Sequence, residues 1–278
     1  MQDLKQFISG GYGSGDIRTE QYLETKIQDY IESNTIMKNY CEMYPIPATY
    51  PSAVIPTIEK TGSAGTISEG TEIPTFTMTS SSFTVKVEEY GTAAEVTDAA
   101  RMTDWLGITG QLTIREAGRQ MVRKENADIM AVILAGAGTT MPASTTNTFK
   151  YEDVVAMETA FENMDMHGDT CFIAPDQKAD ILLDERFLDA SKSGTTDTLR
   201  EGTIGRISSC NIVVIPEMPS GTAIMMDSSL SPLWFVTKEN LTIENYRLPK
   251  TGITGFTVRA WGKPAVTRSD AIIKLINC

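Results

Sequence analysis

The amino-acid sequence predicts an α+β protein in which extended segments accompany a compact α/β unit. Three observations support this: a proline-interrupted, Thr/Ser-rich stretch from Ile46 to Val87, a long helical pattern that ends near Ala135, and alternating helices and strands from Tyr151 onward. The prolines exclude helix from most of the first stretch, and the alternation within Phe83–Val87 indicates a β-strand. Because an isolated two-stranded arm is marginally stable in water, we expect it to pack against a second copy of the same protein.

The elements before the α/β unit follow from local signals. The glycine-rich residues 9–15 predict a flexible start, and the apolar spacing over 18–34 predicts a helix. The extended stretch is expected to turn near residues 61–65, where small residues gather, and a strand continues to about Glu95. Thr97-Asp98 offers the cap of a short helix, and Thr103-Asp104 the cap of a long helix that reaches about Ala135.

From Tyr151 the pattern alternates between helix and strand, which is typical of a small α/β unit of about 80 residues. Strands then return from Leu233 to the end of the chain. The expected helices are 151–163 and 175–183, and the expected apolar strands are 171–174, 211–215, 223–226 and a final buried strand, 271–276.

Composition excludes several classes of function. A formal net charge of −12 disfavours a general nucleic-acid-binding face. No apolar run approaches the roughly 18 residues of a membrane helix, and the start of the chain lacks the apolar stretch of a secretory signal. The four cysteines form no CxxC pair, so we expect free thiols in a reducing cytoplasm instead of a zinc site or disulfides, with Cys278 the most exposed.

No catalytic constellation is present. The sole histidine, His167, lies in a predicted helix-to-strand turn between Asp165 and Asp169, where a solvated turn is favoured over a metal loop. A GxSxG motif is missing, and the glycine-rich residues 10–15 lack the lysine and preceding strand of a phosphate-binding loop. Adjacent carboxylates such as Glu88-Glu89 are expected on solvated surfaces. We therefore expect a protein that is not an enzyme and that has no cofactor and no metal.

One charge pattern suggests a contact. Arg115, Arg119 and Arg123 recur at every fourth position, so they share one face of the long helix. Stacked like charges favour acidic partners, and Glu116 and Glu125 are expected to offer some local relief. One interpretation is a solvated basic stripe. The other is intersubunit pairing with acidic residues of a neighbour's loop, for which Glu69 and Glu72 are the candidates; contact with DNA is a third interpretation.

The order of elements resembles the major capsid proteins of tailed phages and related viruses, the Hong Kong 97-type capsid fold. Individual motifs in the chain are similar to the family's loop, spine helix, axial strands and closing strands in the same order. These motifs are Glu69–Pro74, Glu95–Ala100, Arg115–Ile133, Cys171–Pro175, Leu199–Ile207, Asn211–Pro216, and Thr257–Val266 with Asp270–Ile272.

The resemblance implies a division of the chain. Residues 1–50 would be the N-terminal arm, 51–90 the extended loop, 91–150 the spine helix and peripheral domain, 151–232 the α/β axial domain, and 233–278 the closing strands of the peripheral domain. It also implies a major capsid protein of the virion, assembled in the host cytoplasm as hexamers and pentamers of an icosahedral shell. Such a shell encloses double-stranded DNA without reading its sequence, and scaffolding, portal and decoration proteins are its further partners.

Two other functions are compatible with parts of this pattern. An encapsulin-like nanocompartment resembles the same fold but holds enzyme cargo in place of a genome. An independent α/β enzyme is the third hypothesis, and the missing catalytic motifs argue against it. Neighbouring genes would separate the first two, and a stable monomer of about 30 kDa that never forms shells would weaken both.

Overall fold

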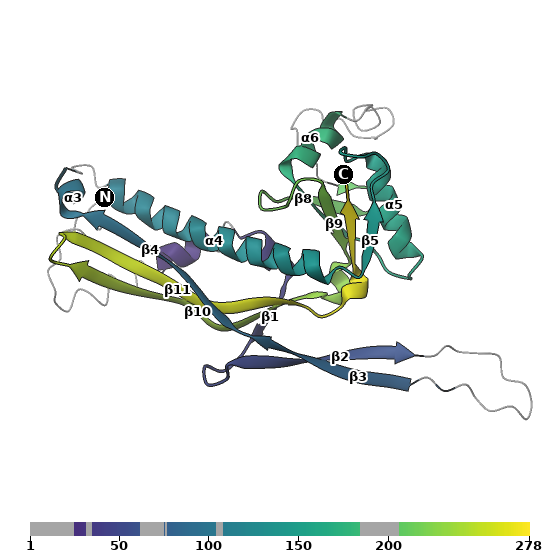
Figure 1. Ribbon diagram of the computed structural model, residues 1–278, viewed down its shortest axis with the longest axis horizontal. Coiled ribbons are helices and arrows are strands. Elements are labelled where there is room, and N and C mark those ends of the chain that lie inside the picture. Colours follow the sequence, from purple (N-terminus) through teal and green to yellow (C-terminus); the bar gives the residue numbers. More distant parts are fainter. Residues whose placement is uncertain (1–24, 32–34, 62–74, 76, 104–107, 184–205) are drawn as a thin grey trace, which may run out of the picture.

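The computed structural model describes residues 25–31, 35–61, 75, 77–103, 108–183 and 206–278 (Figure 1). The chain forms a long platform of strands lined by a helix, a compact α/β unit at one end of the platform, and a β-hairpin that projects beneath that unit. Among the described helices, none has both the length and the apolar character needed to cross a membrane.

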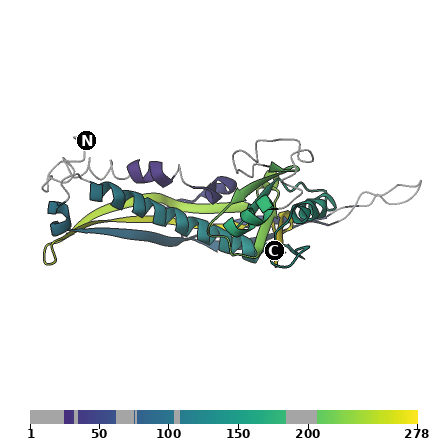
Figure 2. The same cartoon turned by 90° about the horizontal axis from the view of Figure 1, so that it is seen from above.

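The platform is a four-stranded sheet with the order β1-β10-β11-β4. β1 runs parallel to β10, and the other pairs are antiparallel. Figure 2 shows the helix α4 running lengthwise along this sheet. The bounds are Glu42–Pro45 for β1, Glu88–Thr97 for β4, Leu233–Leu248 for β10, Ile253–Val266 for β11 and Ile108–Gly136 for α4.

The α4 helix forms because apolar residues recur at helical spacing along one face. Ala117, Met121, Ile129 and Ile133 are separated by multiples of four and are all buried. The helical residues 25–31 pack on the same helix at Gly118, where an added Cβ would lie 2.7 Å from the ring of Tyr30. A glycine that lowers intrinsic helix propensity is therefore required here for close approach.

A short helix capped at Thr97-Asp98, followed by a long helix that reaches about Ala135, was expected, and this prediction is confirmed. The short helix is α3 (Asp98–Thr103), and the long helix is α4, which the structure describes from Ile108 to Gly136. The cap expected at Thr97 is confirmed, because its Oγ1 accepts a hydrogen bond from the Ala100 amide at 3.2 Å. Asp104 and most of the expected helix 18–34 lie outside the described residues.

The α/β unit contains a six-stranded sheet with the order β5-β12-β9-β6-β8-β7 and two helices. Its helices and four of its strands confirm the predicted segments to within about one residue. The bounds are Thr139–Pro142 for β5, Tyr151–Glu162 for α5, Thr170–Ile173 for β6, Pro175–Leu183 for α6, Arg206–Ile207 for β7, Cys210–Val214 for β8, Thr222–Met226 for β9 and Ile272–Ile276 for β12.

The pairing of β5 and β12 differs from the expected division of the chain. Both strands were placed with the peripheral elements, in 91–150 and 233–278. In the structure β12 pairs with β9 and with β5 inside the six-stranded sheet. The physical reason is burial: Ile273 and Leu275 contribute to the same apolar core as α5 and β6.

The last residue corrects another expectation. Cys278 was expected to be the most exposed thiol, but it is buried in the core of the α/β unit. Its amide donates to the Gly221 carbonyl at 3.2 Å, and the Gln177 side chain donates to its sulfur at 2.9 Å. All four cysteines are free thiols, as expected.

The expected two-stranded arm is confirmed as an antiparallel hairpin, β2 (Ser52–Thr61) and β3 (Thr77–Lys86). Its base packs on the platform: Ala53, Ile55 and Val85 are buried against Val236 and Ala265. The remainder extends past the edge of the platform (Figure 1). The expected turn near residues 61–65 lies outside the described residues.

Candidate assembly surfaces

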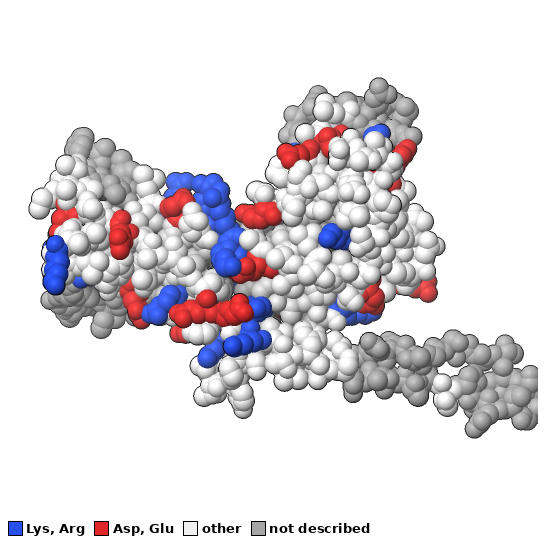
Figure 3. Space-filling model, viewed as in Figure 1, with Lys and Arg blue, Asp and Glu red and all other residues white. Residues whose placement is uncertain are grey.

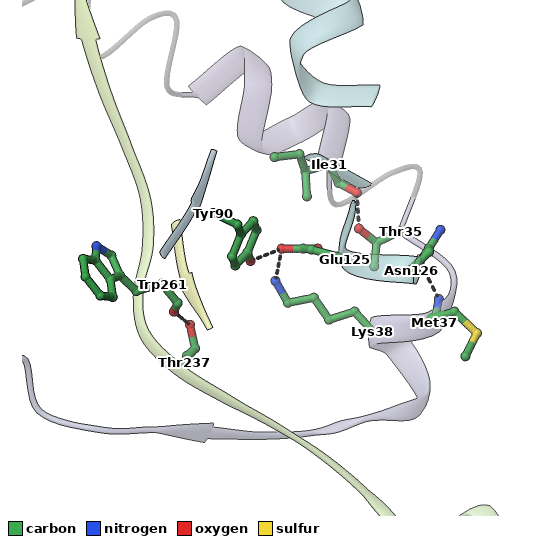
Figure 4. A network of polar contacts seen from close by, with 9 residues as sticks. All are labelled: Ile31, Thr35, Met37, Lys38, Tyr90, Glu125, Asn126, Thr237 and Trp261. Carbon is green, nitrogen blue, oxygen red and sulfur yellow. Dashed lines mark hydrogen bonds and ion pairs between the residues drawn. The ribbon is translucent and has the colours of Figure 1, made fainter. Parts of the chain in front are cut away.

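A buried carboxylate joins three elements where the N-terminal segment meets the long helix. Glu125 of α4 is only 5% exposed. Its Oε1 accepts a hydrogen bond from the Tyr90 hydroxyl of β4 at 2.6 Å and pairs with Lys38 Nζ at 3.0 Å (Figure 4). Lys38 belongs to a 3₁₀ turn, η1 (Met37–Tyr40), so one carboxylate connects the arm, the helix and the sheet. We call these three residues the Glu125 network.

The same turn is held by neighbouring contacts. The Met37 amide donates to Asn126 Oδ1 at 3.4 Å, and the Met37 side chain is fully buried beside Ile129. The Lys38 ammonium also lies 4.8 Å from the centre of the Phe235 ring, a favourable cation–π position. Burial of a charge is costly unless it is paired, so these contacts fix η1 in one register on α4.

The environment of this network favours protonated neighbours. Burial raises the pKa of the Cys41 thiol to about 12, with nearby Lys38 acting to lower it and Glu125 to raise it. Burial also raises the pKa of Tyr90, and the charge of Glu125 adds to that effect. Tyr90 therefore stays a hydrogen-bond donor to Glu125. Within the described residues, Glu125 Oε2 is buried and has no hydrogen-bond partner.

The face of the platform opposite α4 carries a ladder of charged side chains. Lys263 pairs with Glu88 at 2.5 Å, and Arg259 lies between Glu89 and Glu244. Figure 3 shows acidic side chains in a band along this part of the molecule, with basic side chains at its ends. Such exposed pairs stabilise the sheet weakly.

Beside this ladder, a tyrosine bridges the sheet. Tyr246 of β10 lies over Gly255 of β11, and its hydroxyl donates to Glu95 of β4 at 2.6 Å. A Cβ at Gly255 would come within 2.8 Å of the tyrosine ring. The glycine is therefore what allows the ring to cover the central strand.

The predicted arginine stripe is present on α4. Arg115, Arg119 and Arg123 are all exposed, and Arg119 lies 3.9 Å from Glu116 in an exposed pair. Glu125 does not relieve these charges as expected, because it points into the Glu125 network on the buried side. Glu69 and Glu72 lie outside the described residues, so their pairing with the stripe stays a prediction.

The expected solvated turn at His167 is confirmed. His167 is exposed, and its backbone amide donates to Asp227 Oδ2 at 3.0 Å. Asp169 accepts a hydrogen bond from the amide of Ser228 at 3.0 Å. Both Asp227 and Asp169 therefore accept hydrogen bonds from backbone amides. Across the part of the chain that the structure describes, no group of three His, Cys, Asp or Glu side chains is arranged to hold a metal ion.

Sequence reasoning missed the Glu125 network, although one signal was available. Glu125 stands at the fourth position after Met121 and the fourth before Ile129, so it interrupts the apolar stripe of the helix. A carboxylate on a buried face requires a partner. The identity of that partner could not be read, because Lys38 and Tyr90 are far away in sequence.

Comparisons with known proteins agree with this architecture. Residues 81–275 match the family model described as phage capsid protein. The structure is similar to the capsid of cyanophage P-SCSP1u (TM-score 0.69, 15% identity, covering 87% of this chain and 88% of that one). It is also similar to the head of Helicobacter pylori bacteriophage KHP40 (TM-score 0.66, 8% identity, 86% and 88%). Curated protein sequences give no match.

One further similar structure comes from a nanocompartment, the SrpI encapsulin complex of Synechococcus elongatus PCC 7942 (TM-score 0.56, 11% identity, 87% and 86%). At such low identities these structures establish the fold, the Hong Kong 97-type capsid fold, and the match to the family model covers most of the chain. The chain belongs to the phage capsid protein family and is a structural component of the virion capsid, not an enzyme.

Proposed function

We propose that this chain is the major capsid protein whose hexamers and pentamers build an icosahedral shell around double-stranded viral DNA. The family match carries the proposal, because it includes three of the four platform strands, the helix α4 and nearly all of the α/β unit. The hairpin supports it, because among the described residues only its base is covered by its own chain, and a two-stranded ribbon is marginally stable without further packing. In a shell of identical subunits that partner is a neighbour.

The arginine stripe is a second part of the proposal. Arg115, Arg119 and Arg123 pair with Glu69 and Glu72 in the loop of a neighbouring subunit. The support is that α4 leaves all three arginines exposed, with one weak pair to Glu116. Each contact would be small and salt-dependent. Scaffolding, portal and decoration proteins are proposed as further partners of the assembled shell.

Electron microscopy of the purified chain tests the proposed function directly. Closed shells with five-fold and six-fold clusters are expected, and size-exclusion chromatography should show them eluting far ahead of a 30.4 kDa monomer. A chain that stays monomeric at every salt concentration and protein concentration would contradict it. Co-expressed scaffold is the control for shells that need an assembly partner.

An encapsulin-like shell around enzyme cargo is the second candidate, favoured by the similarity to the Synechococcus encapsulin complex. The contents of particles purified from their natural source separate the two. Nuclease-protected double-stranded DNA supports the viral function. A single co-purifying enzyme inside DNA-free particles supports the nanocompartment.

A further inference from the structure

One terminal strand of the platform has an open edge. β4 pairs with β11 on one side, and no other strand among the described residues pairs with it (Figure 1). The Asp98 amide, which follows β4 directly, donates to the Gly252 carbonyl at 2.7 Å. Because bonding direction alternates along an antiparallel strand, the odd-numbered residues of β4 turn their amides and carbonyls to the open side. These residues are Glu89, Gly91, Ala93, Glu95 and Thr97, and we call them the β4 edge.

The β4 edge is accessible along its whole length. All five of its residues are exposed, whereas Tyr90 and Ala94, which alternate with them, pack with the core beneath α4. A row of unpaired backbone groups is a template for an added strand, and sheets protect such edges with bulges, prolines or charges. β4 contains no proline, and its ten residues pair with β11 without a bulge. Its protection therefore comes from charge.

The charges of the β4 edge are acidic and widely spaced. Glu89 and Glu95 are six residues apart, which is about 20 Å along a strand. Glu89 shares Arg259 with Glu244, so one cation serves two carboxylates. Glu95 accepts a hydrogen bond from the Tyr246 hydroxyl, which is neutral. The edge therefore keeps negative charge near both of its ends.

This charge pattern disfavours a second copy of the chain as the added strand. In the antiparallel register centred on Thr92, Glu89 of each copy would lie opposite Glu95 of the other. Like charges directly opposite each other destabilise a pair of strands. The formal net charge of −12 adds repulsion between any two copies. The same glutamates attract a strand that carries positive charge.

We propose that the β4 edge binds an extended segment of a basic partner protein, which adds a strand to the platform and places a Lys or Arg opposite each glutamate. In either strand direction these two basic residues are six positions apart. Between the glutamates, Gly91 and Ala93 have no long side chain that would block the approach. Backbone hydrogen bonds supply the affinity of such a contact, and the two charge pairs supply its specificity. The inference goes beyond the shell-forming function and does not depend on it, because a single subunit presents the same edge.

Amide hydrogen exchange of the unassembled full chain tests the contact. The probe is the synthetic peptide TTKTYTVTKTT, whose lysines are six positions apart, and TTETYTVTETT is its matched control. The basic peptide should slow exchange of the Gly91, Ala93 and Glu95 amides about fivefold or more. The amides of Thr92 and Ala94, which face β11, should not change. Absence of this alternating protection, or equal protection by both peptides, would overturn the proposal.

Charge reversal gives a second readout. Glu89→Lys/Glu95→Lys should bind the acidic peptide at least about tenfold more tightly than the basic one in a fluorescence anisotropy titration, which is the reverse of the parent's preference. Glu42→Lys, on the strand β1 at the other edge of the platform, is the control and should keep the parent's preference. A charge-reversed variant that still prefers the basic peptide would overturn the proposal.

A proline separates strand addition from general attraction of charges. Ala93→Pro removes an amide that faces the open side and leaves the amides that face β11 in place. It should weaken binding of the basic peptide about fivefold or more, whereas Ala93→Val should bind like the parent. Parent-like binding by Ala93→Pro would overturn the proposal. Because these titrations use unassembled subunits, absence of shells would count against the proposed function alone.

Discussion

The α/β unit and the region around the hairpin place large apolar side chains in opposite environments. In the α/β unit Phe161 and Ile173 are fully buried among residues of the same chain. Around the hairpin, Tyr50 and Val54 are more than half exposed. The first region carries its stability within one subunit. The second exposes apolar side chains that a neighbouring subunit would cover in the proposed shell, and the account therefore assigns folding and assembly to different segments of the chain.

The junction between these regions adds a third kind of contact. At the Glu125 network a buried charge, and not apolar packing alone, fixes the position of the arm. Buried ion pairs contribute little net stability compared with apolar replacements, but breaking one partner is costly. We infer that the network specifies where η1 lies on α4. A fixed position of η1 would matter in the proposed shell, where the arm and the hairpin contact neighbouring subunits.

The largest expected effect is in the α/β core. Phe161→Ala should lower the free energy of unfolding by about 3–5 kcal/mol, because it leaves a cavity among fully buried side chains. Urea denaturation of the unassembled subunit measures it. Val54→Ala, which truncates an exposed side chain, should change it by less than about 0.5 kcal/mol. Equal effects of the two substitutions would remove the proposed distinction between the regions.

Breaking the Glu125 network should have the next largest effect. Glu125→Ala leaves Lys38 and the Tyr90 hydroxyl without their shared acceptor and should cost about 2–3 kcal/mol. Amide hydrogen exchange should show faster exchange of the Met37 amide. Lys124→Ala, on the exposed side of the same helix, is the matched control. The double variant Lys38→Met/Glu125→Leu should regain the lost free energy of unfolding, while the Met37 amide still exchanges faster than in the parent. That result would show that the network fixes the position of η1, as inferred.

High pH should lower the free energy of unfolding in part through this same junction. Cys41 has an ordinary pKa of 9.0, and burial raises it to about 12 in the folded chain. The folded state therefore holds this proton more tightly, so its stabilising contribution is complete below pH 9 and is lost as the pH rises towards 12. Unfolding curves between pH 8 and 11 check this. Cys41→Ala should flatten the decline, and an unchanged slope would show that the thiol is not its cause.

The Tyr246 bridge should be sensitive to an added side chain beneath it. Gly255→Val brings a Cβ against the tyrosine ring and the Ala94 carbonyl, so a loss of about 1–3 kcal/mol is expected. Thr257→Val, two residues along the same face, should cost less than about 1 kcal/mol. Thermal unfolding of the subunit distinguishes them. If Gly255→Val unfolds at the temperature of the parent, the Tyr246 ring moves aside at no cost in stability. The hydrogen bond to Glu95 would then not contribute to the stability of the platform.

The smallest expected effect is at the helix cap. Thr97→Ala removes the acceptor for the Ala100 amide on an exposed six-residue helix and should cost about 0.5–1 kcal/mol. Thr97→Ser keeps the hydroxyl and serves as the control. A loss that Thr97→Ser shares would point to packing of the threonine methyl group in place of the cap.

Local signals predicted much of this fold. Alternation of apolar residues identified the hairpin strand β3, and proline at Pro175 marked the start of α6. The pairing of β5 with β12 could not be predicted, because Thr139 and Ile273 are opposite each other in the sheet but distant in the chain. The hydrophobic pattern of the sequence also could not show that Cys278 packs in the core of the α/β unit.

The candidate sites were predicted less completely, for a related reason. The arginine stripe follows from spacing within one helix, which sequence shows directly. The Glu125 network and the β4 edge depend on which elements meet, or fail to meet, in three dimensions. Tyr44 and Ile55 are both apolar residues in predicted extended chain, and only the fold makes one exposed and the other buried.

The most direct test of the central claim is to shorten the hairpin. Residues 58–80 are replaced by Asn-Gly, which forms a tight two-residue turn between the paired Thr57 and Ser81. The buried base of the hairpin is retained. The account predicts a subunit that unfolds within about 1 kcal/mol of the parent and forms no shells by electron microscopy. Normal shells from the shortened chain would contradict the separation of folding from assembly.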